Sequence, residues 1–481
     1  METQQVEFLV VGGGPGGTPA AMALAAAGKS VMLVEKGPGL GGTCLFEGCI
    51  PSKIFRESAR RLREIKQAGQ FGLCLPTQDV TVNWSAVLQR KRSILQHRSE
   101  AAQHKTTQLP TLQTVFGNCK LLSPRSAVIE SGTETDDSQT LQVTFEKAIL
   151  ATGSVPFIPP IRGSDLPRVH DSESILNIDH IPQRLVIIGG GPIGVELGQV
   201  FHTLGSEVSL LEAAPHILGP VDEELSHHLQ QRMSDDGIDI QTNCKVRTIL
   251  TTGQNVFVEY SSNGEAKQHK LADTVLMVTG RQPNVSGLGL ENTAVQYDKH
   301  GLKVNDTLET DEAGIYAVGD VIGQPMFAHW ATAQGLALAR HLLAQPVMFP
   351  DTKTNSAVIF SEPEIGIAGL NEQQAKQAGI NVQVARYDFK HDARAQIAGS
   401  ADGLLKIVFD ADNRKVVGVH IMVEGASELM GEAALLIKAA VPIEAIAAAI
   451  HPHPTLTESF AMAVRNVMAQ RSAASKTAGH H

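Results

Sequence analysis

Two stretches of the chain share one order of apolar and polar positions. Residues 6–17 (VEFLVVGGGPGG) form an apolar run that ends in glycines, and residues 18–28 follow as a helical stretch of small residues. Residues 30–36 (SVMLVEK) are a second apolar run, and the same order returns over residues 184–212. A short apolar run bounded by glycine is typical of a buried strand, so each stretch predicts a β-α-β unit.

Each predicted unit carries three glycines at its first turn and an acidic residue where its second strand ends. The positions are Gly12, Gly14, Gly17 and Glu35 in the first unit, and Gly189, Gly191, Gly194 and Glu212 in the second. Glycines let the backbone approach a pyrophosphate, the helix N-terminus supplies free N–H groups, and the carboxylate accepts hydrogen bonds from a ribose. Two unrelated glycine turns are the alternative, but two complete copies favour two dinucleotide sites.

The pattern beyond these units divides the chain into domains. Residues 149–154 (ILATGS) and 276–281 (LMVTGR) are apolar runs followed by Thr-Gly, which we interpret as chain crossings between domains. After about residue 350, alternating positions predict antiparallel strands, accompanied by helices. We expect an α/β protein with two Rossmann-like domains and a C-terminal α+β domain. The predicted boundaries are 1–150, 151–280, a central segment 281–350, 351–470, and a small, polar, disordered tail 471–481.

Composition and charge narrow the choice of partners. The chain has 481 residues, of which 42 % are hydrophobic and 19 % charged, with a net charge of −10. This charge argues against a nucleic-acid or anionic-membrane partner. No apolar run approaches the length of a membrane span, and the N-terminus lacks the basic region of a signal peptide. We therefore expect a cytoplasmic protein.

Two of the 5 cysteines, Cys44 and Cys49, lie close together in GGTCLFEGCIPSK. A straight helix rises about 7.5 Å over five residues, whereas disulfide-bonded Cα atoms lie within roughly 6.8 Å, so the two can bridge only where the segment bends. Gly48 and Pro51 favour a bend, and the helix predicted to follow stabilises a thiolate at its N-terminus. A zinc site and two inert thiols are alternatives. A redox-active pair is favoured, since two dinucleotides imply electron transfer and a flavin can accept electrons from a thiolate.

A second candidate for chemistry is HPHPTLTESF, residues 451–460. His453 is a candidate general base, oriented by Glu458, that takes the proton of an incoming dithiol. A metal-binding His pair and a helix cap around Thr455 to Glu458 are the alternatives. No cluster of further ligands accompanies the histidines, and we expect no metal.

These motifs resemble the flavoprotein disulfide reductases, the pyridine-nucleotide–disulfide oxidoreductase family, over nearly the whole chain. GGTCLFEGCIPSK matches the redox signature of that family, and HPHPTLTE and GASELMGEAALLIK match the branch that oxidises dihydrolipoamide. The resemblance implies an FAD domain, an inserted NAD domain, a central segment that completes the FAD domain, and a dimerisation domain. It implies as partners a second copy of the chain and another protein that carries a lipoyl group.

The resemblance also assigns roles to residues of this sequence. Cys49 would face the flavin and Cys44 would exchange with substrate, Lys53 would pair with Glu196 near flavin N5, and His453 and Glu458 would act on the disulfide of the other subunit. The positions implied for FAD are Gly12, Gly14, Gly17, Glu35, Thr43, Lys53, Gly153, Asp320 and Ala328. Those implied for NAD are Gly189, Gly191, Gly194, Glu212 and Gly280. Glu212 favours NAD over NADP, because a carboxylate repels a 2′-phosphate and Ala213 and Ala214 cannot bind one.

Three positions depart from the family pattern. Glu47 places a negative charge near the thiols, which predicts a raised thiol pKa. Trp330 stands where a lysine or a small residue is common, and Pro192 stands where many relatives place a side chain over the nicotinamide. These departures leave open a reductase of another disulfide, such as glutathione or a persulfide, or an enzyme dedicated to a lipoyl protein of sulfur oxidation. A scaffold that binds FAD without turnover is the alternative from another class.

Overall fold

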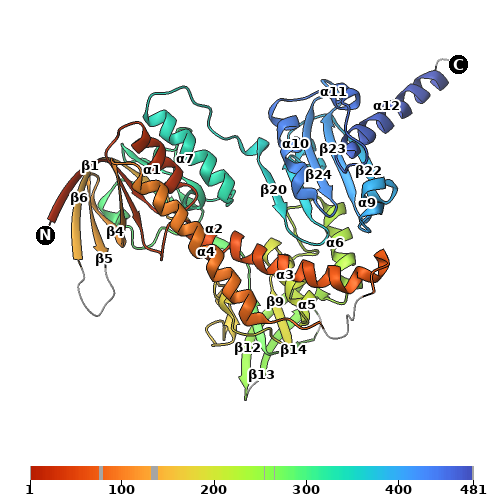
Figure 1. The fold of residues 1–481 in the computed structure, drawn as a ribbon, viewed down its shortest axis with the longest axis horizontal. Coiled ribbons are helices and arrows are strands. Elements are labelled where there is room, and N and C mark those ends of the chain that lie inside the picture. The colour runs from red at the N-terminus through yellow and green to blue at the C-terminus, as the bar shows by residue number, and fades with distance from the viewer. Residues whose placement is uncertain (1, 75–79, 132–138, 254, 265, 479–481) are drawn as a thin grey trace.

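The computed structural model describes residues 2–74, 80–131, 139–253, 255–264 and 266–478, and the domains it contains are drawn in Figure 1. A first sheet lies at one end, a C-terminal domain at the other, and a second sheet lies below and between them. Within the described residues, no helix is both long and apolar enough to span a membrane.

The first sheet has the strand order β3-β2-β1-β6-β5-β4, and β19 pairs with β6. Its strands are β1 (Glu2–Val11), β2 (Val31–Glu35), β3 (Leu112–Phe116), β4 (Asn118–Ser123), β5 (Ser126–Ser131), β6 (Gln139–Leu150) and β19 (Ile315–Ala317). Val11 of β1 pairs with both Val34 and Leu150, and all these pairings are parallel. The carboxyl ends of three strands therefore meet at one edge, where ligands bind in open α/β sheets.

Helices surround this sheet and extend from it. They are α1 (Gly17–Ala26), α2 (Gly42–Phe46), α3 (Cys49–Gln67), η1 (Ala68–Phe71), α4 (Trp84–Thr107) and α7 (Ala328–Leu342). The residues of α1 are small because the helix lies close to the strand: a Cβ on Gly17 would lie 1.9 Å from the carbonyl oxygen of Gly12. The central segment supplies β19 and α7, and so adds to the first domain.

The second sheet is parallel, in the order β11-β10-β9-β15-β8. Its strands and helices are β8 (Val169–His170), η3 (Ser174–Asn177), β9 (Arg184–Ile188), α5 (Pro192–Thr203), β10 (Glu207–Leu211), α6 (Glu223–Asp235), β11 (Asp239–Gln241) and β15 (Thr274–Met277). An antiparallel sheet of β12 (Cys244–Thr252), β13 (Asn255–Ser262) and β14 (Gln268–Ala272) accompanies it. The two crossings between the domains, β7 (Ser154–Pro156) and β16 (Arg281–Pro283), pair with each other in antiparallel fashion.

An aromatic cluster joins the two domains. The Phe55 ring of α3 lies 4.7 Å from the Trp84 ring of α4, which in turn lies 6.2 Å from the Phe201 ring of α5. The Trp84 indole N–H donates to the carbonyl oxygen of Ile178 at 3.0 Å. The three rings are buried, so the two domains share one hydrophobic core rather than meeting at a wet interface.

The C-terminal domain is an antiparallel sheet in the order β20-β21-β24-β23-β22, covered by helices. The elements are η6 (Thr352–Thr354), β20 (Ser356–Ile359), β21 (Ile365–Gly369), α8 (Glu372–Gln377), β22 (Val382–Asp388), η7 (Phe389–His391), α9 (Ala393–Ile397), β23 (Leu404–Asp410), β24 (Val416–Met422), α10 (Ala426–Lys438), α11 (Ile443–Ala448) and α12 (Glu458–Ala478). The remaining short elements of the central segment are η4 (Leu290–Asn292), β17 (Tyr297–Asp298), β18 (Gly301–Leu302) and η5 (Gly319–Ile322).

The tail predicted to be disordered, residues 471–481, overlaps helix α12, which continues to Ala478 and projects from the domain in Figure 1. Adding residues to an existing helix needs no new nucleus, and this stretch contains alanines, an arginine and a lysine, which favour helix. Residues 479–481 lie outside the described residues.

A buried ion pair fastens the C-terminal domain to the second domain. The Lys406 ammonium of β23 lies 2.7 Å from a carboxylate oxygen of Asp222, which caps the N-terminus of α6. The two side chains are only 4 % and 6 % exposed. Removing one partner of a pair this well buried would leave the other charge in a site shielded from water, which is costly. The pair therefore holds β23 against the start of α6.

Candidate active site

The turn after β1 forms the first dinucleotide cradle. Gly12 has φ +110°, and a Cβ there would lie 2.2 Å from the carbonyl oxygen of Ala151. A Cβ on Gly14, in contrast, would meet only the Gly42 Cα at 3.8 Å, so this face of the turn is open to a ligand. The Glu35 carboxylate closes the turn, accepting from the N–H of Gly13 and of Gly37 at 2.6 Å each. The residues fit the adenosine and pyrophosphate of a dinucleotide.

The turn after β9 repeats this geometry. Gly189 has φ +115°, with a would-be Cβ 2.4 Å from the Val278 carbonyl oxygen, whereas a Cβ on Gly191 would have nothing within 4 Å. Glu212 accepts from the N–H of Gly190 at 2.5 Å and of Ala214 at 2.6 Å. Pro192 begins α5, where its missing N–H costs nothing. The second cradle is thus a structural copy of the first.

A cavity of about 1020 Å³ connects the first cradle to the thiols and to α5. Nearly all the residues predicted to contact FAD lie on its wall: Gly12, Gly14, Glu35, Thr43, Lys53, Gly153, Asp320 and Ala328. Gly17 and the three glycines of the second cradle are not among the residues that line it, and Gly17 is packed against Gly12 inside the turn. The cavity fits FAD, because its wall includes the glycine turn that suits the adenosine half and the two thiols that would react with the flavin.

The chain bends between the two cysteines, as the spacing predicted. Helix α2 ends at Phe46, and α3 begins at Cys49 after Gly48, whose φ −149° and ψ −107° are neither helical nor extended. Both cysteines are free thiols and line the cavity. A hydrogen bond from the Cys44 thiol, together with the positive charge of Lys53, lowers the pKa of Cys49 to about 7, and the same bond raises the pKa of Cys44. Cys49 is therefore the thiolate of the pair at neutral pH.

Lys53 and Glu196 meet on the cavity wall although 143 residues separate them. The Lys53 ammonium donates to Glu196 Oε2 at 2.7 Å, and the backbone N–H of Phe360 donates to Glu196 Oε1 at 2.9 Å. The ammonium also lies 4.5 Å from the centre of the Phe360 ring. Sequence reasoning missed Phe360, for which the local sequence carries no signal.

Asp320 is a half-buried carboxylate on the cavity wall. Burial raises its pKa, and the Ser154 hydroxyl donates to it at 2.7 Å. The Arg281 guanidinium in turn donates to the Ser154 hydroxyl at 2.8 Å and to Glu173 at 2.9 Å. Sequence reasoning missed Arg281 and Ser154, although each directly follows one of the two Thr-Gly pairs.

Glu47 does not act on the thiols in the way its position predicted. Burial raises the pKa of Glu47, and its main charged neighbours are Glu173 and Arg281. The charges that act most on the thiols are instead those of Lys53, Arg98 and Glu196. Glu47 lies only two residues before Cys49, but its carboxylate faces another part of the cavity. Trp330 is buried within α7.

His453 and Glu458 form a pair, but the chain does not bring them to its own thiols. His453 Nδ1 lies 3.1 Å from both carboxylate oxygens of Glu458, and the His453 side chain is 73 % exposed. The N–H of Thr455 donates to Glu458 at 2.9 Å and lowers its pKa, so the helix-cap alternative holds as well. The sequence did not reveal a second pair, His451 and Glu432. His451 Nε2 lies 3.1 Å from Glu432 Oε1.

No group of three or more His, Cys, Asp or Glu side chains could hold a metal ion among the residues that the structure describes.

Two family models match the sequence of this chain. Residues 6–335 match a model described as pyridine nucleotide-disulphide oxidoreductase, and residues 355–464 match the dimerisation domain of the same family. Among curated proteins, the dihydrolipoyl dehydrogenase of Geobacillus stearothermophilus is 35 % identical over 456 residues, 94 % of either chain. Leghemoglobin reductase of Glycine max is 34 % identical, over 94 % of this chain and 86 % of that one.

Solved structures agree with this result. The Cu(II) complex of RclA, a HOCl-induced flavoprotein disulfide reductase of Escherichia coli, superposes with a TM-score of 0.85 at 26 % identity. The match covers 96 % of this chain and 100 % of that one.

Proposed function

Because the chain belongs to the pyridine nucleotide–disulphide oxidoreductase family, we propose that it is a dihydrolipoyl dehydrogenase that uses FAD and NAD. The net reaction converts a dihydrolipoyl group and NAD⁺ into a lipoyl group, NADH and a proton. Relatives of this name match over 94 % of the chain, which supports the proposal. The observation that carries it is the exposed His453–Glu458 pair, a base suited to an incoming dithiol.

The residues of the chain divide the chemistry between them. In the oxidised enzyme Cys44 and Cys49 form a disulfide. His453 removes a proton from one substrate thiol, and the resulting thiolate attacks the Cys44 sulfur, releasing Cys49 as a thiolate. The second substrate thiol then displaces Cys44, which closes the lipoyl disulfide and leaves the enzyme dithiol. Lys53 stabilises the Cys49 thiolate through its charge. FAD, held by Gly12, Gly14, Glu35 and the other residues of the cavity wall, would supply the electron relay between the dithiol and NAD⁺.

A homodimer is part of the proposal. His453 is exposed and does not line the cavity with the thiols of its own chain, so we infer that it serves the thiols of a second copy. The matched dimerisation domain supports this inference. The substrate group is then carried by a separate lipoyl protein, and we place the enzyme in the cytoplasm.

The decisive experiment measures NADH formation from free dihydrolipoamide by the FAD-loaded protein, with NAD⁺ and NADP⁺ compared side by side. We expect fast turnover with NAD⁺ and little with NADP⁺, because Glu212 repels a 2′-phosphate. Absence of turnover by a yellow, dimeric protein would refute free dihydrolipoamide as a substrate.

A second candidate is an NAD(P)H-dependent reductase of another disulfide. One observation favours it, the superposition with RclA. NADH oxidation with glutathione disulfide or a persulfide as acceptor distinguishes the two. Turnover there that exceeds turnover with lipoamide would replace the first proposal with this one.

A further inference from the structure

The Lys53–Glu196 pair is part of a closed group that includes Phe360. Glu196 accepts from the Lys53 ammonium with one carboxylate oxygen and from the Phe360 N–H with the other. The Lys53 ammonium also lies over the Phe360 ring, at 4.5 Å from its centre. Each member thus touches both others, and the position of Phe360 helps to determine where the ammonium sits.

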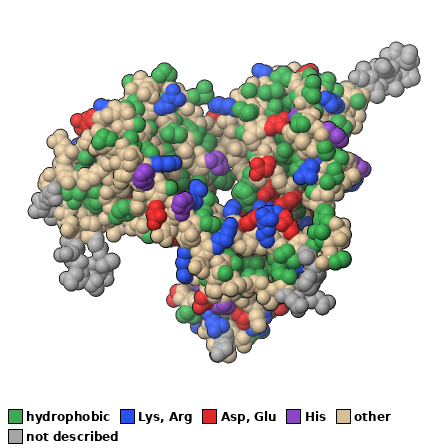
Figure 2. Space-filling view, viewed as in Figure 1, with side chains coloured by type: hydrophobic (Ala, Val, Ile, Leu, Met, Phe, Trp, Pro, Cys, Tyr) green, Lys and Arg blue, Asp and Glu red, His purple; other side chains and the backbone are tan. Residues whose placement is uncertain are grey.

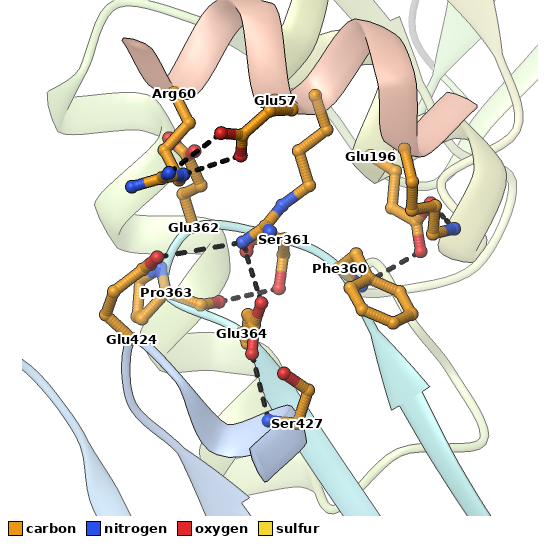
Figure 3. Close-up of polar contacts among 12 residues, drawn as sticks. Glu57, Arg60, Glu196, Phe360, Ser361, Glu362, Pro363, Glu364, Glu424 and Ser427 are labelled. Atoms are coloured by element: carbon orange, nitrogen blue, oxygen red, sulfur yellow. Dashed lines mark hydrogen bonds and ion pairs between the residues drawn. The ribbon is translucent and has the colours of Figure 1, made fainter. Parts of the chain in front are cut away.

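Phe360 begins a short segment, residues 360–364, that is held from α3. The Arg56 guanidinium donates to the Ser361 carbonyl oxygen at 3.3 Å and lies 3.0 Å from Glu364. The side chains of Arg56 and Glu364 are only 13 % and 5 % exposed, so their ion pair is shielded from water. Figure 3 shows Ser361 and Glu364 directed toward the centre of this network, below α3.

The same segment is held from two other helices. Glu364 accepts from the Ser427 N–H of α10 at 2.9 Å. Glu362 exchanges two hydrogen bonds with Gln199 of α5, at 2.8 and 2.9 Å, and pairs with Arg63 of α3. Figure 2 shows acidic and basic side chains gathered where α3 meets the C-terminal domain. The segment is therefore a junction of the three domains.

Lys53 and Arg56 are three residues apart on α3, and so share one face of the helix. Both cations face the Phe360 ring, the Arg56 guanidinium at 5.8 Å from its centre. Arg56 therefore contacts the segment in two ways, through the ring and through the ion pair with Glu364. Lys53 in turn acts on the thiols through its charge.

We propose that Arg56 is a positioning residue: it holds segment 360–364 against α3, and so keeps Phe360 where it fixes the Lys53 ammonium beside Glu196 and the thiols. Arg56 does not line the cavity and acts on it only through Phe360. The inference rests on the flavin–thiol chemistry of the family and is independent of which disulfide is the substrate.

The test measures how the thiolate–flavin charge-transfer absorbance of the two-electron-reduced holoenzyme depends on pH. In Arg56→Met we expect the midpoint of this titration to rise by about half a pH unit, because a displaced Lys53 ammonium stabilises the Cys49 thiolate less. Below the midpoint, this rise corresponds to a roughly threefold lower thiolate fraction. Arg61→Met is the matched control, since Arg61 lies on the same helix, is 65 % exposed and pairs with Glu57 and Glu64 of α3 itself.

Phe360→Leu isolates the contact through which Arg56 acts. We expect it to raise the midpoint similarly, and Arg56→Met/Phe360→Leu to shift no further than Phe360→Leu alone. Arg56→Lys keeps a charge that can pair with Glu364 but loses the planar guanidinium that faces the Phe360 ring, and we expect it to restore the midpoint only partly.

Three outcomes would overturn the proposal: an unchanged midpoint in Phe360→Leu, additive shifts in the double variant, or an equal shift in Arg61→Met. Additivity would mean that Arg56 acts by its own charge. Phe360→Leu adds no buried charge, so it keeps the proposal testable even where Arg56→Met does not fold. Activity with dihydrolipoamide is a separate measurement, so a failed substrate assignment leaves this test intact.

Discussion

Cys49 and Lys53 lie one helical turn apart at the start of α3. The thiol of Cys44 and the ammonium of Lys53 both stabilise a negative charge on Cys49, while desolvation opposes it. At Cys44 the hydrogen bond that it donates and its burial raise the pKa and outweigh the charges of Lys53 and Arg98, which act in the opposite direction. At the scale of single residues, the two thiols are therefore unequal before any substrate binds.

This inequality predicts different effects of replacing each cysteine. In the reduced holoenzyme, Cys49→Ser should abolish the thiolate–flavin charge-transfer absorbance, and Cys44→Ser should keep it. In the wild type the band should grow as the pH rises through about 7, since the thiolate is the deprotonated form. A visible absorption titration of the three proteins checks this, and the reverse pattern would falsify the assignment of the two thiols.

Glu212 gives a second prediction at this scale. Its two oxygens accept from Gly190 and Ala214, which holds the carboxylate at the second glycine turn. Glu212→Gln should raise KM for NAD⁺ about tenfold with little change in kcat, because binding is weakened equally in ground and transition states. Steady-state kinetics measure this, with Glu207→Gln, an exposed neighbour on β10, as the control. An unchanged KM would remove Glu212 from the nucleotide site.

Elements far apart in sequence are joined by few but buried polar contacts. The ion pair of Lys406 with Asp222 links β23 to the start of α6, and the contacts of Arg56 link α3 to the segment after β20. Such pairs add little stability over an apolar contact of the same shape, yet breaking one leaves a buried charge. Their main effect is on geometry between elements.

Asp222→Ala should therefore destabilise the protein by about 1–3 kcal/mol, because it removes the buried partner of Lys406 and the cap of α6. The Lys406 ammonium keeps only the half-exposed Glu224 at 3.0 Å, which limits the loss. Adding Lys406→Leu to this variant should recover part of the loss, since a buried charge without a buried partner is then gone. Melting temperatures at one scan rate test both steps. A double variant less stable than Asp222→Ala would contradict the argument from the buried charge.

Prediction from sequence succeeded where the signal is local. Both glycine turns, Glu35 and Glu212 follow from spacing within about thirty residues, as does the bend between the cysteines. The pairing of Lys53 with Glu196 came from resemblance alone, and that of Arg56 with Glu364 did not come at all. Long-range partners leave no periodicity in the chain, so only the folded structure reveals them. Composition alone carries no signal for the end of α12, because residues 471–478 continue a helix that began earlier in the chain.

At the scale of the whole molecule, a single chain holds one half of each proposed active site. The thiols line an internal cavity, while His453 lies exposed on the C-terminal domain. A homodimer with closed symmetry can complete two such sites at once, each from both copies.

Co-expression of Cys44→Ser and His453→Ala chains tests this arrangement. Random pairing makes half of the dimers mixed, and each mixed dimer has one intact site, so about a quarter of wild-type turnover should return. Each variant expressed alone is the control and should be nearly inactive. No recovery in the mixture would show that His453 serves its own chain.

The aromatic cluster between the domains has an optical consequence. The chain contains only 2 tryptophans, and Trp84 lies at the junction of α3, α4 and α5 while Trp330 lies in α7 near the cofactor cavity. Their emission therefore reports on different places, one on whether the domains remain joined and the other on the flavin compartment. A Trp330→Phe protein would carry a single fluorophore at the junction, and separation of the domains would shift its spectrum to the red.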